Sequence, residues 1–289
     1  QAGAHRPRRR QWRRRTGKAR KPNKVIAVLV SRTNGRFHLL ALVALLFLGG
    51  GAQAAQPLSS LPLEALGDNH WLLPAGEHLG QFRIDQPLTL RCAPGAVLDA
   101  GGQGNALTIA AAQVTVEGCN IRNWGRDLTA MNSAIFVERS GRGAILRDNH
   151  LEGAGFGIWL DGTADASVLG NRIEGDPSVR SQDRGNGIHL YAVTGARVIG
   201  NHVQQTRDGI YIDTSNGNRL EGNVLEDLRY GVHYMFANDN SVIGNVTRRT
   251  RTGYALMQSR KLEVIGNRSE GDENYGILMN YITYSTIRN

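Results

Sequence analysis

The chain has 289 residues, of which 20% are charged and 6% are aromatic, and it contains 36 glycines against 8 prolines. This composition is typical of a folded protein of one or two domains rather than of a disordered tail. The formal net charge of +9 would suit a nucleic-acid-binding protein, but residues 1–54 hold 13 of the 34 basic residues and no acidic one. The rest of the chain is mildly acidic and its arginines are scattered singly, so we exclude a nucleic-acid-binding domain.

Residues 30–54 have the composition of a secretory signal peptide. Arg32 and Arg36 precede the apolar run 39–48, and a stretch of small residues follows it. The run is shorter than the ~20 residues that span a bilayer, so we favour a cleavable signal, cut before Ala55, over an uncleaved anchor. The sequence therefore predicts an exported protein.

The next part of the chain contains short apolar segments separated by turn-forming residues. Examples are 88–90, 107–109 and 114–116, in which Thr alternates with apolar residues. Such segments are typical of β-strands joined by tight turns. We expect them to be a less regular form of the repeat that follows, starting after a capping stretch near Trp71.

Cys92 and Cys119 are the two cysteines of the chain, and their separation is close to one repeat unit. Exported proteins meet an oxidising compartment, so the pair is a candidate disulfide between neighbouring coils. Two isolated buried thiols are the alternative. Without matching His or Cys spacing, the pair does not predict a zinc site.

From position 149 onward the sequence repeats with a period of about 22 residues. Glycine followed by an apolar residue recurs in step with asparagine, and each of these glycines is followed by an asparagine at a nearly constant distance, the last of them Asn289. Two markers in one register over six units indicate a genuine internal repeat. The asparagines are Asn149, Asn171, Asn201, Asn223, Asn245 and Asn267, and the glycines are Gly157, Gly187, Gly209, Gly231, Gly253 and Gly276.

Each unit contains a short alternating apolar stretch, a polar turn, a second apolar stretch and Gly-Asn. A unit of this length leaves no room for two helices, and the frame of a leucine-rich repeat is missing. We therefore predict an all-β fold, a right-handed parallel β-helix whose coils stack at the ~4.8 Å strand spacing. In such a solenoid the six asparagines would form a structural ladder of side-chain amides at one corner.

We expect the β-helix domain to occupy residues 55–289. Asn289 falls on the repeat phase, so the stack would end without a cap, and we interpret the sequence as truncated there. Residues 1–29 are rich in arginine and lack Met and acidic residues, and we interpret them as mis-assigned upstream sequence or a disordered arm. The repeat step from Asn171 to Asn201 is longer than the others, which places an insert within 174–184; it is a functional loop or a tolerated surface loop.

Alternation along each strand that follows the marker glycine predicts an outward face with two columns of side chains. A solvated strand face usually carries Thr, Ser, Lys and Glu, so a stripe of rings, imidazoles and thioethers predicts a binding surface. The first column reads Trp159, His189, Tyr211, His233, Ala255 and Leu278, and the second reads Asp161, Tyr191, Asp213, Met235, Met257 and Asn280.

His233, Met235 and Met257 are close enough in this register to share one ion. His233 and Met235 are i and i+2 on one face, and Met235 and Met257 are neighbours on adjacent coils at about 4.8 Å. An imidazole with two thioethers suits Cu(I) and is poor for Ca²⁺, Mg²⁺ or Zn²⁺. Packing of both methionines against the neighbouring turn is the alternative.

The same stripe allows a second interpretation, a carbohydrate groove. Trp159, Tyr191 and Tyr211 would stack on sugar rings, while Asp161 and Asp213 would act as acid and base. The two carboxylates stand about 9.6 Å apart by backbone spacing, at the far edge of the ~6.5–9.5 Å separation of an inverting hydrolase. Because no lysine lies in the stripe to neutralise a uronate, we favour a binding face over an enzyme.

Several segments resemble the NosD family, which is the periplasmic β-helix protein of nitrous oxide reductase maturation. They are RYGVHYMF at 229–236, GYALMQS at 253–259 and YGILM at 275–279, and the resemblance covers about residues 65–289. The specific part is Tyr-Gly-x-His-x-Met followed one period later by a second methionine. One departure is Arg288, where the repeat has glycine before asparagine.

The resemblance implies a periplasmic partner of an ABC-type ATPase and permease that serves copper-site assembly in nitrous oxide reductase and is not an enzyme. A copper chaperone would be a further partner, and membrane contact would be made only through the permease. Copper, bound transiently, would be the cofactor. The implied ligands are His233, Met235 and Met257, with a wider metal or docking stripe of His189, Tyr191, Tyr211, Asp213 and Met279.

Overall fold

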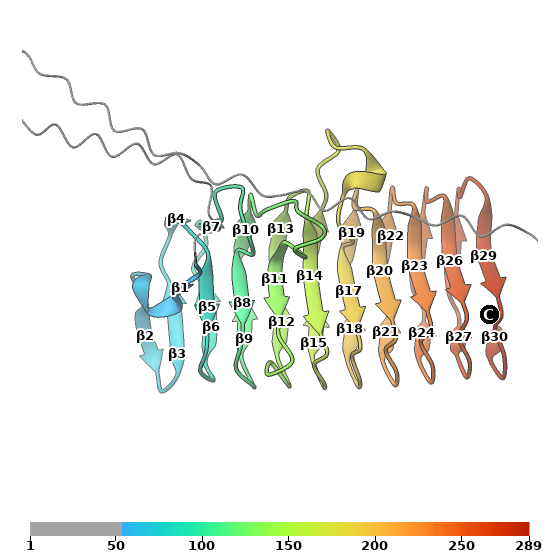
Figure 1. The fold of residues 1–289 in the computed structure, drawn as a ribbon, viewed down its shortest axis with the longest axis horizontal. Coiled ribbons are helices and arrows are strands. Elements are labelled where there is room, and N and C mark those ends of the chain that lie inside the picture. The colour runs from blue at the N-terminus through green and yellow to red at the C-terminus, as the bar shows by residue number, and fades with distance from the viewer. Residues whose placement is uncertain (1–53, 289) are drawn as a thin grey trace, which may run out of the picture. The chain divides into compact units, whose positions relative to one another are not determined.

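The structure is a computed structural model that describes residues 54–288. In this part of the chain the backbone winds into a coil whose turns lie side by side along one axis (Figure 1). Each regular turn gives one short strand to each of three sheets, and neighbouring turns pair in parallel. The exception is the antiparallel pair of β2 (Glu64–Gly67) and β3 (His70–Leu73) in the first turn. The predicted parallel β-helix is confirmed.

The three sheets are named A, B and C. Sheet A consists of β1 (Gln56–Pro57), β5 (Phe82–Ile84), β8 (Leu107–Ile109), β11 (Ser133–Val137), β14 (Phe156–Asp161), β17 (Ile188–Tyr191), β20 (Asp208–Asp213), β23 (Tyr230–Met235), β26 (Thr252–Met257) and β29 (Tyr275–Asn280). Sheet B consists of β2, β3, β6 (Thr89–Cys92), β9 (Thr115–Glu117), β12 (Ile145–Arg147), β15 (Ser167–Leu169), β18 (Arg197–Ile199), β21 (Arg219–Glu221), β24 (Ser241–Ile243), β27 (Glu263–Ile265) and β30 (Thr286–Arg288). Sheet C consists of β4 (Gly76–Leu79), β7 (Ala96–Asp99), β10 (Asn120–Arg122), β13 (His150–Glu152), β16 (Arg172–Glu174), β19 (His202–Gln204), β22 (Val224–Glu226), β25 (Val246–Arg248) and β28 (Arg268–Glu270).

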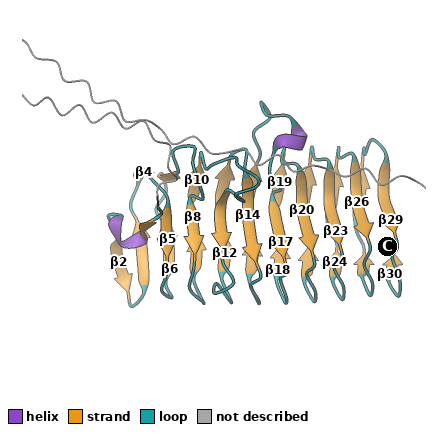
Figure 2. Cartoon of the chain, viewed as in Figure 1, coloured by secondary structure: helices purple, strands orange, loops and turns teal. Residues whose placement is uncertain are grey.

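Two short 3₁₀ helices, η1 (Leu58–Ser60) and η2 (Ser181–Asp183), stand outside the sheets (Figure 2). η2 belongs to the predicted insert, which leaves the coil between β16 and β17 as the yellow excursion of Figure 1. The guanidinium of Arg184 holds this loop down, because it donates to the carbonyl oxygens of Val179 and Gln205, both at 2.7 Å. Among the described residues, no helix is long and apolar enough to cross a bilayer.

The core fills the inside of the coil, because alternate residues of every strand point inward. Leu190, Ile212 and Tyr234 form one fully buried column on successive coils of sheet A. Tyr254 is also in the core, and its hydroxyl donates to the carbonyl oxygen of Asn245 at 2.8 Å. The inward faces of the three sheets therefore make one continuous apolar core.

The repeating asparagines form a hydrogen-bonded column at one corner of the coil. In the middle of it, Asn223 Oδ1 accepts from both the backbone N–H and the side-chain amide of Asn201, each at 2.9 Å. The side-chain amide of Asn223 donates to the carbonyl of Val198 at 2.9 Å and to Asn245 Oδ1 at 2.8 Å. The Asn223 amide thus satisfies two buried backbone groups of the coil before it and links the side chains of the coils on either side.

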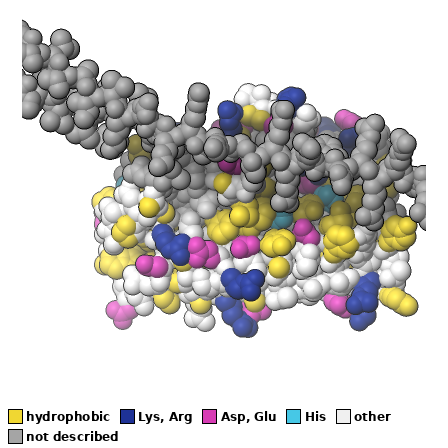
Figure 3. Space-filling view, viewed as in Figure 1, with side chains coloured by type: hydrophobic (Ala, Val, Ile, Leu, Met, Phe, Trp, Pro, Cys, Tyr) yellow, Lys and Arg dark blue, Asp and Glu magenta, His cyan; other side chains and the backbone are white. Residues whose placement is uncertain are grey.

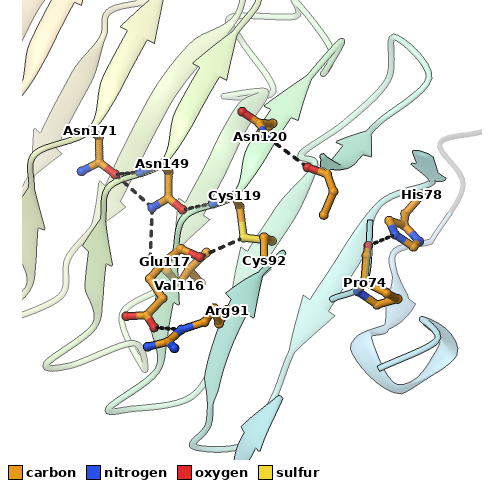
Figure 4. The surroundings of a disulfide bond; sticks show 11 residues. Pro74, His78, Arg91, Cys92, Val116, Glu117, Cys119, Asn120, Asn149 and Asn171 are labelled. Carbon is orange, nitrogen blue, oxygen red and sulfur yellow. Dashed lines mark hydrogen bonds and ion pairs between the residues drawn. A yellow bond between two sulfur atoms is a disulfide. The ribbon is translucent and has the colours of Figure 1, made fainter. Parts of the chain in front are cut away.

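The column continues toward the N-terminus into a disulfide. The backbone N–H of Cys119 donates to Asn149 Oδ1 at 3.0 Å, and the sulfur of Cys119 is bonded to Cys92 (Figure 4). Cys92 ends β6, so the covalent bond joins two neighbouring coils where the amide column stops. A second column, of two asparagines, was not predicted from the sequence. In it the backbone N–H of Asn218 donates to Asn240 Oδ1 at 2.7 Å.

The marker glycines also have a physical reason. Five of them occupy the position before an inward residue of sheet A, and a Cβ there would lie within 2.8 Å of the carbonyl oxygen of the marker glycine on the next coil. Side chains larger than hydrogen would push the coils apart at this corner. The five are Gly157, Gly187, Gly209, Gly231 and Gly253.

Some interpretations from the sequence lie outside the described residues. These are the disordered or mis-assigned segment 1–29, the signal peptide 30–54 except for its last residue, and the repeat phase of Asn289.

Candidate metal-binding site

The outward face of sheet A differs from those of sheets B and C. Outward residues of sheet C are mostly charged and pair between coils, as Arg248 does with Glu226 at 2.9 Å. On sheet A, hydrophobic and histidine side chains gather instead (Figure 3). Charged surface pairs are common on soluble proteins and contribute little, whereas a clustered band of rings and thioethers is unusual. The sheet A face is therefore the candidate site.

Strand registers place the two columns as alternation predicts. In the first column Trp159 pairs with His189, His189 with Tyr211, and Tyr211 with His233. In the second column Asp213 pairs with Met235 and Met235 with Met257. Neighbours within a column are one coil apart, so they lie at the strand spacing of about 4.8 Å.

Trp159, His189 and His233 of the first column are buried and Tyr211 is half-buried, which was not predicted from the sequence. The ring centroids of Trp159 and His189 are 3.9 Å apart, those of His189 and Tyr211 are 4.7 Å apart, and those of Tyr211 and His233 are 4.4 Å apart. Rings wider than the coil spacing cover one another, and Phe156 covers the edge of Trp159. His233, at 7% exposure, is therefore not an ordinary surface histidine.

Burial of Trp159 also corrects the carbohydrate interpretation. Its ring lies between the rings of Phe136, Phe156 and His189, so it is not a platform for a sugar. Tyr191, by contrast, is 45% exposed. The open aromatic surface is smaller than the sequence suggested.

His189 is held neutral by its surroundings. Desolvation by burial lowers the pKa of the His189 imidazole to about 3, and the nearby Asp208 carboxylate offsets only part of this effect. Nδ1 of His189 lies 3.2 Å from the side-chain nitrogen of Asn186, and Nε2 has no hydrogen-bond partner among the described residues. The imidazole is therefore a neutral, buried ring at ordinary pH.

This burial predicts acid sensitivity of the fold. In the unfolded chain His189 takes up a proton near its ordinary pKa of about 6.5, whereas the folded chain does not, so stability is lost as pH falls through that value. Between pH 7 and pH 5 we expect His189 to lower the free energy of unfolding by about 2 kcal/mol. Urea titrations at both pH values measure this change. In His189→Phe the free energy of unfolding should fall by about 2 kcal/mol less between pH 7 and pH 5 than in the unmodified chain. The same fall in both proteins would contradict a neutral, buried His189.

His233 belongs to a buried charge cluster with two residues that were not predicted from the sequence. Asp208 Oδ2 lies 3.0 Å from His233 Nδ1, and the Asp208 carboxylate also accepts from Arg229 Nε at 2.8 Å and Nη2 at 2.6 Å. Burial acts to raise the pKa of Asp208, but the hydrogen bonds from His233 and Arg229 outweigh it and hold that pKa below its usual range. Asp208 is therefore a carboxylate in the folded protein.

The cluster fixes which nitrogen of His233 carries the proton. A carboxylate is an acceptor only, so Nδ1 of His233 must be the donor to Asp208. In the neutral imidazole Nε2 then carries the lone pair, and it is buried without any hydrogen-bond partner in the described part of the chain. An orphaned imidazole nitrogen of this kind is a ready ligand for a metal ion.

Two thioethers lie on the same outward face of the sheet as His233. Met235 lies two residues after His233 on β23, and Met257 lies beside Met235 on β26; both are half-buried. Asp213, the next outward neighbour of Met235, accepts a hydrogen bond from the Thr214 hydroxyl at 2.8 Å. The structure therefore brings the three predicted ligands to one side of two adjacent strands.

Met279 has to be removed from the candidate stripe. Its register partner is Leu256, which is fully buried in the inward column, so Met279 points toward the inside of the coil. It is 56% exposed because no coil packs over β29 among the described residues. Ile277, two residues earlier on β29, also points inward, so alternation of side chains along the strand already predicts an inward Met279.

The donor set fits a soft monovalent metal. Residues 54–288 contain no group of three or more His, Cys, Asp or Glu side chains that could hold a metal ion. The candidate therefore depends on one imidazole nitrogen and two thioether sulfurs, which suit Cu(I). None of these three atoms is suited to Ca²⁺ or Mg²⁺, which prefer oxygen.

A separate cleft of about 490 Å³ lies beside the insert. Asp176 and Pro177 of the insert form one wall, and Trp124 and Arg126 lie among its other lining residues. None of the candidate metal ligands lines this cleft. The insert thus shapes a concavity of its own.

Comparison with known proteins agrees with the resemblance. The family model described as periplasmic copper-binding protein (NosD) matches residues 169–289. Two relatives, both called "Probable ABC transporter binding protein NosD", come from Pseudomonas aeruginosa (67% identical over 246 residues, 85% of this chain) and Stutzerimonas stutzeri (63% over 255 residues, 88% of this chain). The chain spans 58% of the length of each of these relatives.

Among solved structures, the enzymatically active domain of bacteriophage CBA120 tailspike protein 2 is similar with a TM-score of 0.54. The match has 12% sequence identity and covers 75% of this chain and 38% of that one, so it shows a shared fold alone. The high identity to the two NosD relatives decides the family. The chain belongs to the NosD family of periplasmic copper-binding proteins.

Proposed function

We propose that this chain binds Cu(I) on the outward face of β23 and β26 and passes it on during maturation of nitrous oxide reductase. Nε2 of His233 and the sulfurs of Met235 and Met257 would hold the ion, which is cargo rather than a resident cofactor. The observation that carries the proposal is the orphaned, buried Nε2 of His233 on the same face as two methionines that are paired across adjacent coils. The family's description as copper-binding supports the same choice of metal.

The proposed partners follow from the names of the relatives and from the resemblance. The curated relatives are described as ABC transporter binding proteins. We propose that an ABC-type ATPase and permease act with this chain, that a copper chaperone delivers the ion, and that nitrous oxide reductase receives it. The exposed ring of Tyr191 and the half-buried thioethers supply the apolar surface that a docking partner would cover.

We propose binding rather than catalysis for this face. The open carboxylates Asp161 and Asp213 are separated by the coil of Tyr191, about 9.6 Å by backbone spacing. His233 and His189 are buried under rings, where a polysaccharide does not reach them. Release of unsaturated or reducing sugars from alginate or pectin by the purified chain would support the carbohydrate interpretation instead.

The test is anaerobic competition for Cu(I) between the purified full chain and a chromophoric chelator. We expect one tightly bound Cu(I). His233→Ala removes the nitrogen ligand, and the double variant Met235→Ala with Met257→Ala removes both sulfur ligands, so each should weaken binding at least about tenfold. Zn²⁺ should not compete, because thioethers bind it poorly.

Matched controls come from the same chain. Met279→Ala removes a thioether from the inward column, and His202→Ala removes an imidazole from sheet C. Both should keep the affinity of the unmodified chain. If these controls lose Cu(I) as strongly as His233→Ala does, the ion binds elsewhere and the proposed site is wrong.

A further inference from the structure

The carboxylate of Asp208 accepts hydrogen bonds from side chains of the following coil. Arg229 precedes β23 and contacts both carboxylate oxygens, and His233 within β23 contacts Oδ2. The side chain of Asp208 is 1% exposed and that of Arg229 is 26% exposed. A buried carboxylate with this many charge-assisted bonds has a fixed position.

The ring of His233 is fixed from its other sides as well. Tyr211 and Tyr230 meet it edge to face, with centroids at 4.4 Å and 4.9 Å. The guanidinium of Arg229 lies over the ring of Tyr230 at 4.5 Å, so one arginine supports both the carboxylate and the tyrosine. The imidazole therefore has one orientation, with Nδ1 toward Asp208.

We infer that Asp208 and Arg229 are positioning residues of the metal site: they hold His233 with Nδ1 protonated and the Nε2 lone pair free for Cu(I). This inference rests on the proposed function. Neither residue touches the ion; each acts through the imidazole, as outer-shell carboxylates do for metal-bound histidines. The chain would thus keep a binding-ready tautomer before any ion arrives.

Asp208→Asn is the sharpest test, because it keeps the shape and changes the direction of one hydrogen bond. Arg229 has donors only, so the single remaining oxygen of the amide should turn toward the guanidinium. The amide NH₂ then faces Nδ1 of His233, which has to accept. The proton moves to Nε2, and the lone pair that would bind Cu(I) is lost.

Two readouts separate this inference from a purely structural role. In the metal-free, ¹⁵N-labelled full chain, long-range ¹H–¹⁵N NMR should show His233 as the Nδ1–H tautomer, and Asp208→Asn should convert it to the Nε2–H tautomer. The Cu(I) affinity of Asp208→Asn should fall about 10- to 100-fold in the chelator assay.

Asp227→Asn is the matched control. Asp227 is likewise held by two bonds from one arginine, Arg249, at 2.8 and 2.9 Å, but it has no histidine partner among the described residues. This variant should change neither readout.

An Nε2–H tautomer of His233 in the unmodified chain would overturn the inference, and that measurement needs no variant to fold. Wild-type affinity in Asp208→Asn would overturn it too. If the unmodified chain binds no Cu(I) but shows the expected tautomer, the proposed function fails while the positioning of the ring by Asp208 stands.

Discussion

Asn223→Ala is expected to lower the free energy of unfolding by about 4 kcal/mol. The substitution removes four hydrogen bonds in a buried column, and each contributes about 1 kcal/mol net. It also leaves the backbone N–H of Asn201 without its acceptor, and no side chain at position 223 other than an amide can replace both bonds at once. Urea unfolding followed by circular dichroism measures the change.

Asn274→Ala is the control for this prediction. Asn274 is exposed, and its side chain makes no hydrogen bond among the described residues, so its loss should change the free energy of unfolding by less than about 0.5 kcal/mol. Equal effects of the two variants would mean that the amide column contributes nothing specific.

Gly209→Ala is expected to cost about 3 kcal/mol, for a reason opposite to that of the asparagine. A Cβ at this position would lie 2.6 Å from the carbonyl oxygen of Gly231 and 2.9 Å from Cδ1 of Leu228. The carbonyl belongs to the backbone of the next coil, so relief requires the coils to separate locally, and overpacking of this kind is costly. Thermal and urea unfolding should both show the loss.

Gly276→Ala gives a control in the same column. Its nearest neighbour would be Ser269 Oγ at 3.4 Å, an ordinary contact, because no coil packs beyond it in the described residues. We expect no loss, or a gain of up to about 1 kcal/mol from the stiffer unfolded chain. A loss in Gly276→Ala as large as in Gly209→Ala would show that the effect is intrinsic to the strand and not to coil stacking.

The fold could be predicted from the sequence because the residues that repeat every 22 positions, asparagine and glycine, are each required by one structural position of the coil. Asparagine marks a corner where backbone groups need an amide, and glycine marks a corner where two coils touch. The second column, Asn218 and Asn240, was missed although its members are 22 residues apart. It contains only two amides, and a single 22-residue step does not identify a repeat.

The site was predictable only in part. Alternation and period place His233, Met235 and Met257 together, because these contacts run along a strand or straight across to the next coil. The contact between Asp208 and His233 is diagonal: it spans 25 residues, which is longer than the repeat period, and so it lies on neither column. The burial of Trp159, His189 and His233 could not be predicted from alternation either, because it arises from rings that overlap between adjacent coils.

The disulfide between Cys92 and Cys119 has a consequence for how the chain would respond to mechanical force. A stack whose coils touch only their neighbours peels from an end in steps of one coil. A pull on the N-terminal side meets the bond before it reaches the amide column, and the 27-residue separation of the two cysteines then cannot be extended. The tension passes through the sulfur bridge directly to the coil of Cys119, so the residues between the two cysteines add no length to the chain when these coils yield.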